Sequence, residues 1–202
     1  VKNMTGKDEY FPNGNFTFSD NFTTTPLDYR WVGVRGAKEG FISVTAEGLS
    51  IAPYETNIKA KAPTSTLFHR QQHINFTATT TLSYIPRTEK DLAGITCYQS
   101  ESFNYVFGVT KKDNDNYLVL QRTEKGNSSV VASTKIDSAN PIKLQVKAEG
   151  NNYTFSYSAE NDEFKTLGET VSGDILSTNI AGGFTGAMIG LYATYNNDAT
   201  VQ

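Results

Sequence analysis

The sequence contains little of what identifies many functional classes of protein. It has one cysteine, Cys97, so it forms no internal disulfide, and it lacks the run of about 18 apolar residues that a membrane-spanning helix needs. Its net charge is only -3, and its 18 lysines and arginines are scattered rather than gathered into a basic patch. From these absences we expect neither a membrane span nor a nucleic-acid partner.

Signatures of catalysis are also absent from the sequence. There is no Gly-x-Ser-x-Gly elbow, no phosphate-binding loop and no zinc-type spacing of cysteine and histidine. The acidic residues fall mostly in turn-like segments, which is typical of solvated carboxylates rather than of the paired acid and base of a hydrolase. Examples are Asp113, Asp115, Asp162 and Glu163. We therefore expect no catalytic residue in the chain and no required cofactor.

The two histidines, His69 and His73, lie four residues apart. On a helix this spacing places both side chains on one face, as in some metal sites. On a strand the same spacing separates them by roughly 13 Å, which is too far for one metal ion to bridge. Because the residues that follow alternate like a strand, we do not expect a metal site here.

The sequence is rich in the period-two alternation of half-buried strands. Runs of alternating apolar and polar residues contain many β-branched and aromatic side chains, and helical periodicity is almost absent. The clearest runs are 79–84, 105–110, 117–121, 142–148 and 153–157, and turn-like segments lie at 111–116, 124–128 and 149–152. About eleven strands at this spacing predict an all-β fold, an antiparallel two-sheet β-sandwich with Cys97 buried. We expect this domain to span residues 15–202, after a linker or arm over residues 1–14.

Two groups of residues are candidates for surface contacts. If residues 69–79 form one strand, Arg70 and Gln72 share a sheet face, and they offer planar hydrogen-bonding groups to a sugar or a partner domain. The second group is aromatic, and its rings either line a face that stacks on sugars or belong to the core. For Trp31, the alternation of residues 29–34 favours the core. This group is Tyr29, Trp31, Tyr54, Phe103 and Tyr105.

A further candidate is the segment IAGGFTGAMIGLYAT at residues 180–194. Three glycines surround Phe184, and glycine allows backbone paths that other residues resist. The ring of Phe184 then either projects from a loop or caps the edge of the sandwich, with the glycines forming a bulge. The residues alone leave both interpretations open.

Four motifs follow one another along the chain: FSDNF at 18–22, RQQH at 70–73, AGITCYQSESFNY at 93–105 and GGFTGAMIGLYA at 182–193. In this order they resemble the C-terminal concanavalin A-like domain of family 43 glycoside hydrolases, the β-xylosidase and α-L-arabinofuranosidase group. The resemblance runs from about residue 18 to residue 194. It implies a lectin-like jelly-roll sandwich that accompanies a five-bladed catalytic propeller, and none of the propeller is present in this chain.

The resemblance also implies a function. The sandwich of such enzymes packs against the propeller and borders its substrate pocket, which takes xylo- or arabino-oligosaccharides in hemicellulose breakdown. An aromatic residue similar in position to Phe184 reaches this pocket, so Gly183, Phe184 and Thr185 are the expected pocket-bordering residues. The alternatives are an independent carbohydrate-binding module and a domain that only stabilises the propeller.

The ends of the chain carry the remaining expectations. Related domains have an aspartate in their first strand, which Asp20 matches, and they close with an acidic and aromatic strand that residues 195–202 do not reproduce. The resemblance thus suggests a structural calcium at Asp20 and a missing closing strand. Six Asn-x-Ser/Thr sequons suit a secreted protein, extracellular or periplasmic.

Overall fold

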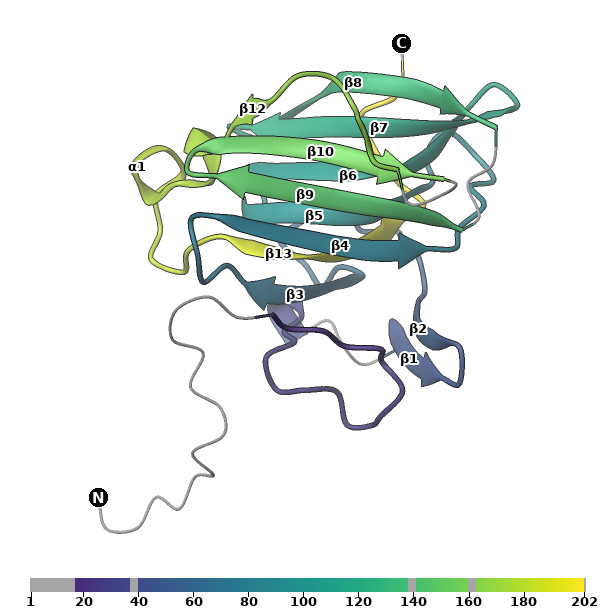
Figure 1. Cartoon of the computed structure of the whole chain (residues 1–202), viewed down its shortest axis with the longest axis horizontal. Coiled ribbons are helices and arrows are strands. Elements are labelled where there is room, and N and C mark those ends of the chain that lie inside the picture. Colours follow the sequence, from purple (N-terminus) through teal and green to yellow (C-terminus); the bar gives the residue numbers. More distant parts are fainter. Residues whose placement is uncertain (1–16, 37–39, 138–140, 160–162, 202) are drawn as a thin grey trace.

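The structure, a computed structural model, describes residues 17–36, 40–137, 141–159 and 163–201. These residues form two stacked antiparallel sheets and a separate hairpin (Figure 1). One sheet has the strand order β3-β13-β5-β6-β7-β8, and the other has the order β11-β10-β9-β4 with β12 paired to β10. The predicted all-β sandwich is confirmed.

The six-stranded sheet consists of β3 (Thr66–Arg70), β5 (Leu92–Ser100), β6 (Phe103–Lys112), β7 (Asp115–Glu124), β8 (Asn127–Ile136) and β13 (Met188–Thr194). The five-stranded sheet consists of β4 (Phe76–Leu82), β9 (Ile142–Glu149), β10 (Asn152–Ser158), β11 (Lys165–Thr166) and β12 (Val171–Ser172). The hairpin is β1 (Ile42–Thr45) with β2 (Gly48–Ile51), and the helical turns are η1 (Val34–Gly36), η2 (Gly173–Leu176) and α1 (Thr178–Ala181). No helix in the described part of the chain is long and apolar enough to span a membrane.

Tight turns set the register of the central strands. β6 and β7 join at Asp113, β7 and β8 at Lys125 and Gly126, and β9 and β10 at Gly150. These residues have positive φ angles between 52° and 79°, which match the twist of a short hairpin and which Asp and Gly adopt most easily. All three turns predicted from the sequence are confirmed.

The central strands of the six-stranded sheet are buried on both faces, whereas its edge strand β8 alternates between exposed and half-buried residues. The main core lies between the sheets and contains Tyr105, Phe107 and Phe155. A second cluster, which includes Phe68 and Tyr192, covers the opposite face of the six-stranded sheet together with segments that precede β3. Residues 92–99 of β5 are accordingly all buried, whereas β9 alternates between buried and more exposed residues. The six-stranded sheet is therefore a middle layer.

The connection between β3 and β4 differs from the single strand predicted over residues 69–79. Residues 69–79 do not form one strand: β3 ends at Arg70 in one sheet, β4 begins at Phe76 in the other, and residues 71–75 cross between them. The backbone N–H of Gln71 donates to Ala187 O at 3.0 Å, and Asn75 Oδ1 accepts from Gly150 N at 2.7 Å. The shared sheet face predicted for Arg70 and Gln72 is therefore wrong.

Both ends of the described chain are held without regular strands. Residues 17–22 around Asp20 form no strand, so the expected first strand is wrong. Residues 195–201 form none either; Gln121 Nε2 donates to Ala199 O at 2.7 Å, and Val201 packs on the second cluster. The arm predicted over residues 1–14 lies outside the described residues. Cys97 is buried as predicted, and burial raises the pKa of its thiol.

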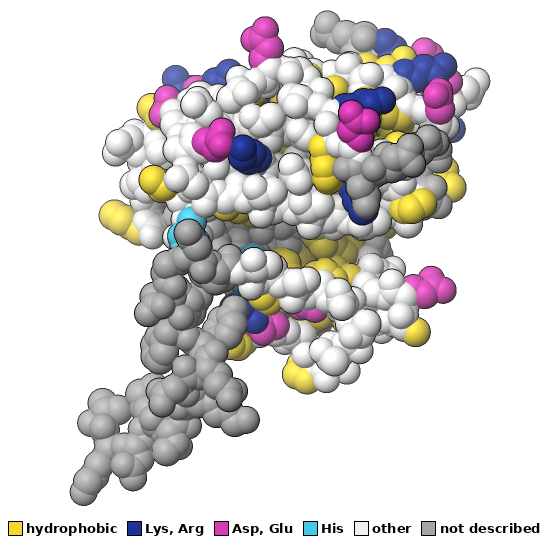
Figure 2. Space-filling view, in the orientation of Figure 1, with side chains coloured by type: hydrophobic (Ala, Val, Ile, Leu, Met, Phe, Trp, Pro, Cys, Tyr) yellow, Lys and Arg dark blue, Asp and Glu magenta, His cyan; other side chains and the backbone are white. Residues whose placement is uncertain are grey.

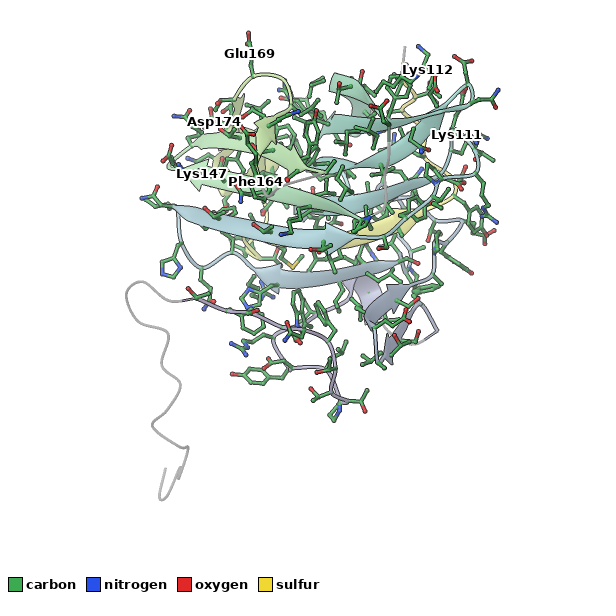
Figure 3. The ribbon with its side chains drawn as sticks, turned by 45° about the vertical axis from the view of Figure 1, so that its right-hand side comes forward. Lys111, Lys112, Lys147, Phe164, Glu169 and Asp174 are labelled. Carbon is green, nitrogen blue, oxygen red and sulfur yellow. The ribbon has the colours of Figure 1, made fainter. Side chains whose placement is uncertain are left out.

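The two ends of the sandwich carry different connections between strands (Figure 1). On the face shown in Figure 2, charges of both signs are interspersed without a patch of one sign. Figure 3 places Lys111 and Lys112 at one end and Asp174 toward the other. The Asp174 end also carries α1 and the residue 71–75 connection (Figure 1), and we call it the glycine-loop end after residues 182–187.

Candidate functional site

The loop of residues 182–187 joins α1 to β13 and carries Phe184. Gly182, Gly183 and Gly186 all have positive φ, of 71°, 77° and 72°. Gly182 also has ψ near -165°, a combination that only glycine adopts readily. The side chain of Phe184 is 104% exposed, so no described residue packs on it. Its ring therefore projects, and the alternative in which it caps the sandwich edge does not describe this structure.

Three carbonyl groups of this loop are held by residues of β3, β5 and the 71–75 connection. Arg70 Nη1 donates to Thr185 O at 2.6 Å, and Gln99 Nε2 donates to Gly182 O at 3.1 Å. The third is Ala187 O, which accepts from the backbone of Gln71. The predicted residues Arg70, Gly183, Phe184 and Thr185 thus lie in one place. Gln72 is exposed on the adjacent connection and has no hydrogen bond to the loop.

Gln71 joins the two sheets beneath this loop. Its Oε1 accepts from Tyr153 Oη at 3.0 Å, and its Nε2 donates to His73 O at 3.0 Å. Burial raises the pKa of Tyr153 to about 12, so its hydroxyl keeps the proton that it donates. Sequence reasoning missed the roles of Gln71 and Gln99. The available signal was a glutamine at the end of an apolar strand, AGITCYQ, where an unpaired polar group is costly.

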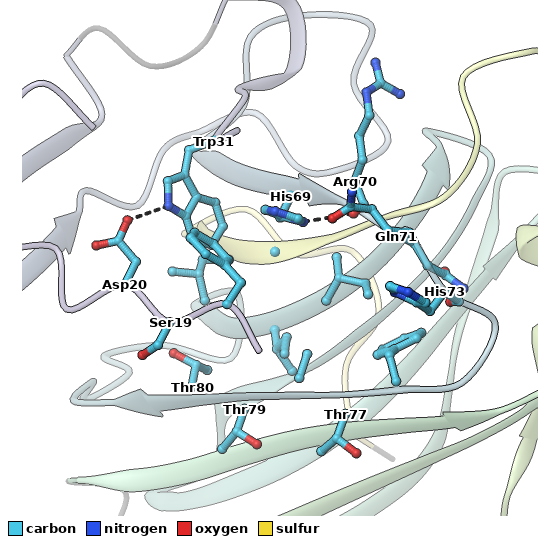
Figure 4. Close-up of a pocket in the computed structure, with 18 of the residues that line it drawn as sticks. Ser19, Asp20, Trp31, His69, Arg70, Gln71, His73, Thr77, Thr79 and Thr80 are labelled. Carbon is cyan, nitrogen blue, oxygen red and sulfur yellow. Dashed lines mark hydrogen bonds between the residues drawn. The ribbon is translucent and has the colours of Figure 1, made fainter. Parts of the chain in front are cut away.

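A groove of about 310 Å³ lies between the edge strands β3 and β4 and the N-terminal segment, and Arg70 and Gln71 are among the residues that line it (Figure 4). Aromatic rings form its outer wall. Phe18 stacks on His69 with ring centroids 5.0 Å apart, and Trp31 lies 5.2 Å from Phe22 and 5.8 Å from both Phe18 and His69. Trp31 is half-buried rather than in the core. The rings pack on one another, which fixes the N-terminal segment against β3.

Asp20 stabilises this aromatic wall. Its Oδ1 accepts from Phe22 N at 2.7 Å, and its Oδ2 accepts from Trp31 Nε1 at 2.8 Å (Figure 4). In the described part of the chain no three or more His, Cys, Asp or Glu side chains gather where they could hold a metal. Calcium prefers six to eight oxygen ligands, so these surroundings do not fit the expected ion. The two carboxylate oxygens instead accept from partly buried N–H donors.

The histidines are separated by the break between β3 and β4. His69 Nδ1 is 2.9 Å from Arg70 O and therefore donates to it, and His69 Nε2 is buried without a hydrogen-bond partner in the described structure. His73 lies on the crossing connection, where its carbonyl accepts from Gln71. Within the described residues the pair belongs to no metal-binding cluster.

The aromatic face proposed from the sequence does not form. Phe103 and Tyr105 are 9% and 1% exposed and belong to the main core, where Tyr105 Oη donates to Ser172 O at 2.9 Å. Their assignment as surface contacts is wrong, because β6 is buried on both faces. Tyr29 is 83% exposed, whereas Tyr54 packs on Phe41. The binding-module alternative loses the stacking surface on which it rested.

Asp91 and Asp28 are carboxylates with structural partners. Asp91 is the buried one among them; it accepts from Arg87 N and Thr88 Oγ1 at 2.9 Å and so fixes the connection before β5. At the surface, Arg30 hydrogen-bonds Asp28 and lowers the pKa of that carboxyl to about 2. A carboxylate that stays ionised to so low a pH is a poor general acid.

Comparison with known proteins finds relatives along nearly the whole chain. The family model described as a beta-xylosidase C-terminal concanavalin A-like domain matches residues 19–202. A crystal structure of a GH43_12 protein retrieved from a capybara gut metagenome is 46% identical, with a TM-score of 0.85, over 96% of this chain and 37% of that chain.

Two curated relatives are similar at lower identity. The non-reducing end alpha-L-arabinofuranosidase BoGH43B of Bacteroides ovatus is 26% identical over 185 residues, which is 91% of this chain and 35% of the relative. A xylosidase/arabinosidase of Butyrivibrio fibrisolvens is 28% identical over 178 residues, which is 87% of this chain and 34% of the relative. The chain therefore spans about a third of the length of these relatives.

Proposed function

The chain belongs to the family of beta-xylosidase C-terminal concanavalin A-like domains, and from that premise we propose that it is the non-catalytic accessory domain of a family 43 glycoside hydrolase. Its partner is a catalytic propeller, and Phe184 borders the substrate pocket of that partner. The observation that carries this proposal is the fully exposed ring of Phe184 on a loop that glycines and hydrogen bonds hold away from the sandwich.

The residues around Phe184 support the proposal that a partner domain covers the glycine-loop end. Burying a phenylalanine side chain is worth about 1.5–3 kcal/mol, and this chain by itself makes no use of that energy. Two further large apolar side chains lie exposed on segments next to the loop, Ile74 at 72% and Ile180 at 49%. The hydrogen bond between Gln71 N and Ala187 O ties the segment of Ile74 to the loop. A partner seated on the glycine-loop end would bury all three.

The ring suits a role in a pentoside pocket. Aromatic rings pack well on the C–H faces of sugars, and an apolar wall excludes water from the bond that is broken. Glycoside hydrolysis also needs a pair of carboxylates, one as acid and one as base or nucleophile. We assign these carboxylates to the propeller, and a xylo- or arabino-oligosaccharide is the proposed ligand between the two domains.

The proposal is tested in the intact enzyme that carries this domain, assayed with aryl β-xylopyranosides and aryl α-L-arabinofuranosides. Phe184→Ala is expected to lower kcat/KM about tenfold, which corresponds to about 1.4 kcal/mol of lost transition-state stabilisation. Tyr29→Ala is the matched control, because it removes an aromatic ring that is also exposed but lies in the N-terminal segment. Equal kcat/KM values for Phe184→Ala and the unmodified enzyme would contradict the proposal.

A further inference from the structure

Two side chains outside the glycine loop hold its backbone on either side of Phe184. Gln99, near the end of β5, donates to Gly182 O at 3.1 Å, two residues before Phe184. Arg70, the last residue of β3, donates to Thr185 O at 2.6 Å, one residue after it. The two bonds come from different strands and bracket the exposed ring.

The loop has few other means of keeping one conformation. Three of its six residues are glycines, which have more backbone freedom to lose than any other residue. Phe184 makes no packing contact that would restrain it. The remaining backbone bonds, from Gly182 N to Thr178 O and from Gln71 N to Ala187 O, lie at the two ends of the loop. The direction of the ring therefore depends on the side-chain bonds to Gly182 and Thr185.

The state of Gln99 indicates that its bond to the loop is its main polar role. Its side chain is 4% exposed, its Nε2 is used for Gly182, and its Oε1 is buried without a hydrogen-bond partner. A buried amide whose oxygen has no hydrogen-bond partner lowers the stability of the sheet, and an apolar residue at the same position would avoid this cost. Arg70 complements it from the exposed side with a charged donor, which makes a stronger bond to a carbonyl than a neutral donor does.

We propose that Arg70 and Gln99 are positioning residues, which preorganise the 182–187 loop so that Phe184 is presented in one direction to the neighbouring pocket. The inference rests on the proposed function of Phe184. A loop that becomes ordered only on binding loses conformational entropy at that step, which weakens binding. A loop that is fixed before the substrate arrives avoids this loss, so the Phe184 ring contributes more to the pocket.

The experiment uses the intact enzyme and three variants. Arg70→Met removes the charged donor and keeps a long side chain, Arg70→Lys keeps a charged donor, and Gln99→Glu keeps the shape but replaces the donating NH2 by an acceptor. Arg87→Met and Gln145→Glu are the matched controls. Arg87 lies before β5 at the opposite end of the sandwich, and Gln145 lies on β9, where its Nε2 donates to Thr79 Oγ1 rather than to the loop.

Two readouts are measured on each variant. Amide hydrogen exchange of Gly182 and Gln71, whose N–H groups donate to Thr178 O and Ala187 O at the two ends of the loop, is expected to be roughly tenfold faster in Arg70→Met and Gln99→Glu, while exchange in β5 and β13 stays slow. The value of kcat/KM is expected to fall about three- to tenfold in the same variants, and Arg70→Lys is expected to recover part of this loss. In combination with Phe184→Ala, Arg70→Met is expected to cause no further loss, because it acts through the ring.

The outcomes separate this inference from the proposed function. If Arg70→Met leaves loop exchange unchanged, or if its kinetic loss adds fully to that of Phe184→Ala, Arg70 does not position the ring. If Gln99→Glu disturbs the whole sheet, slow exchange in β5 is lost, and the Arg70 variants decide the matter. If Phe184→Ala alone leaves the kinetics unchanged, the proposed function fails, and loop exchange still decides whether Arg70 and Gln99 hold the loop.

Discussion

Replacement of Tyr192 by phenylalanine removes a hydroxyl that accepts a buried hydrogen bond in the second cluster. Tyr192 lies on β13, is 2% exposed, and its hydroxyl oxygen accepts from Ile58 N at 2.8 Å. Tyr192→Phe removes only that oxygen and leaves no cavity of note. The N–H of Ile58, which is itself 7% exposed, then stays buried without a partner. An unsatisfied buried donor costs about 1–3 kcal/mol of unfolding free energy.

The assay is thermal and urea unfolding of the 202-residue chain. For a chain of this size each kcal/mol shifts Tm by about 2–4 °C, so Tm is expected to fall by about 2–12 °C with an unchanged urea m-value. Tyr157→Phe is the control, because Tyr157 is half-buried and its hydroxyl makes no hydrogen bond in the described structure. A loss below about 0.5 kcal/mol of unfolding free energy for Tyr192→Phe would contradict this prediction, because substitutions at ordinary surface positions have effects of that size.

Three further predictions concern other parts of the fold. Asp20→Asn is expected to cost about 1 kcal/mol of unfolding free energy, because the amide group has one oxygen and cannot replace both carboxylate oxygens that accept from Phe22 N and Trp31 Nε1. A chelator is expected to leave Tm unchanged, and a fall in Tm with chelator would support the calcium site. Gly182→Ala is expected to cost about 1–3 kcal/mol through backbone strain alone, since open space surrounds the new methyl group, and an unchanged Tm would show that the loop adopts another path. Burial raises the pKa of Tyr153 to about 12 from 10.0, so its contribution to stability is complete below pH 10 and is lost as the pH rises toward 12. Because burial also raises the pKa of other tyrosines, urea unfolding at pH 8 and pH 11 is compared between the unmodified chain and Tyr153→Phe, and an equal loss of stability in the two would contradict the prediction.

Features of the fold that depend on local sequence were predictable. The hairpin turns at Asp113, Gly126 and Gly150 follow from residues that tolerate positive φ, and the strands follow from alternation. The three glycines around Phe184 likewise indicated a loop, although alternation could not decide between a projecting and a capping ring. Local patterns carry this information because they act within a few residues.

Features that depend on contacts between distant segments were not predictable in the same way. Phe103 and Tyr105 remained candidates for a surface, because alternation does not show that both faces of a sheet are covered. The crossing at residues 71–75 continues the polar alternation of a strand, and only the sheet pairing shows where β3 ends. Gln99 meets Gly182 across 83 residues of chain, and no sequence pattern marks that pair.

The most direct test of the proposed role of Phe184 is a crystal structure of the intact enzyme with xylose or arabinose bound in the pocket of its catalytic domain. We predict that ring carbons of Phe184 lie within about 4.5 Å of the sugar, the distance of an apolar contact, with Arg70 and Gln99 still bonded to the loop. A Phe184 ring that remains in solvent, or that packs on the partner away from the pocket, would contradict the claim that this domain completes a neighbour's binding site.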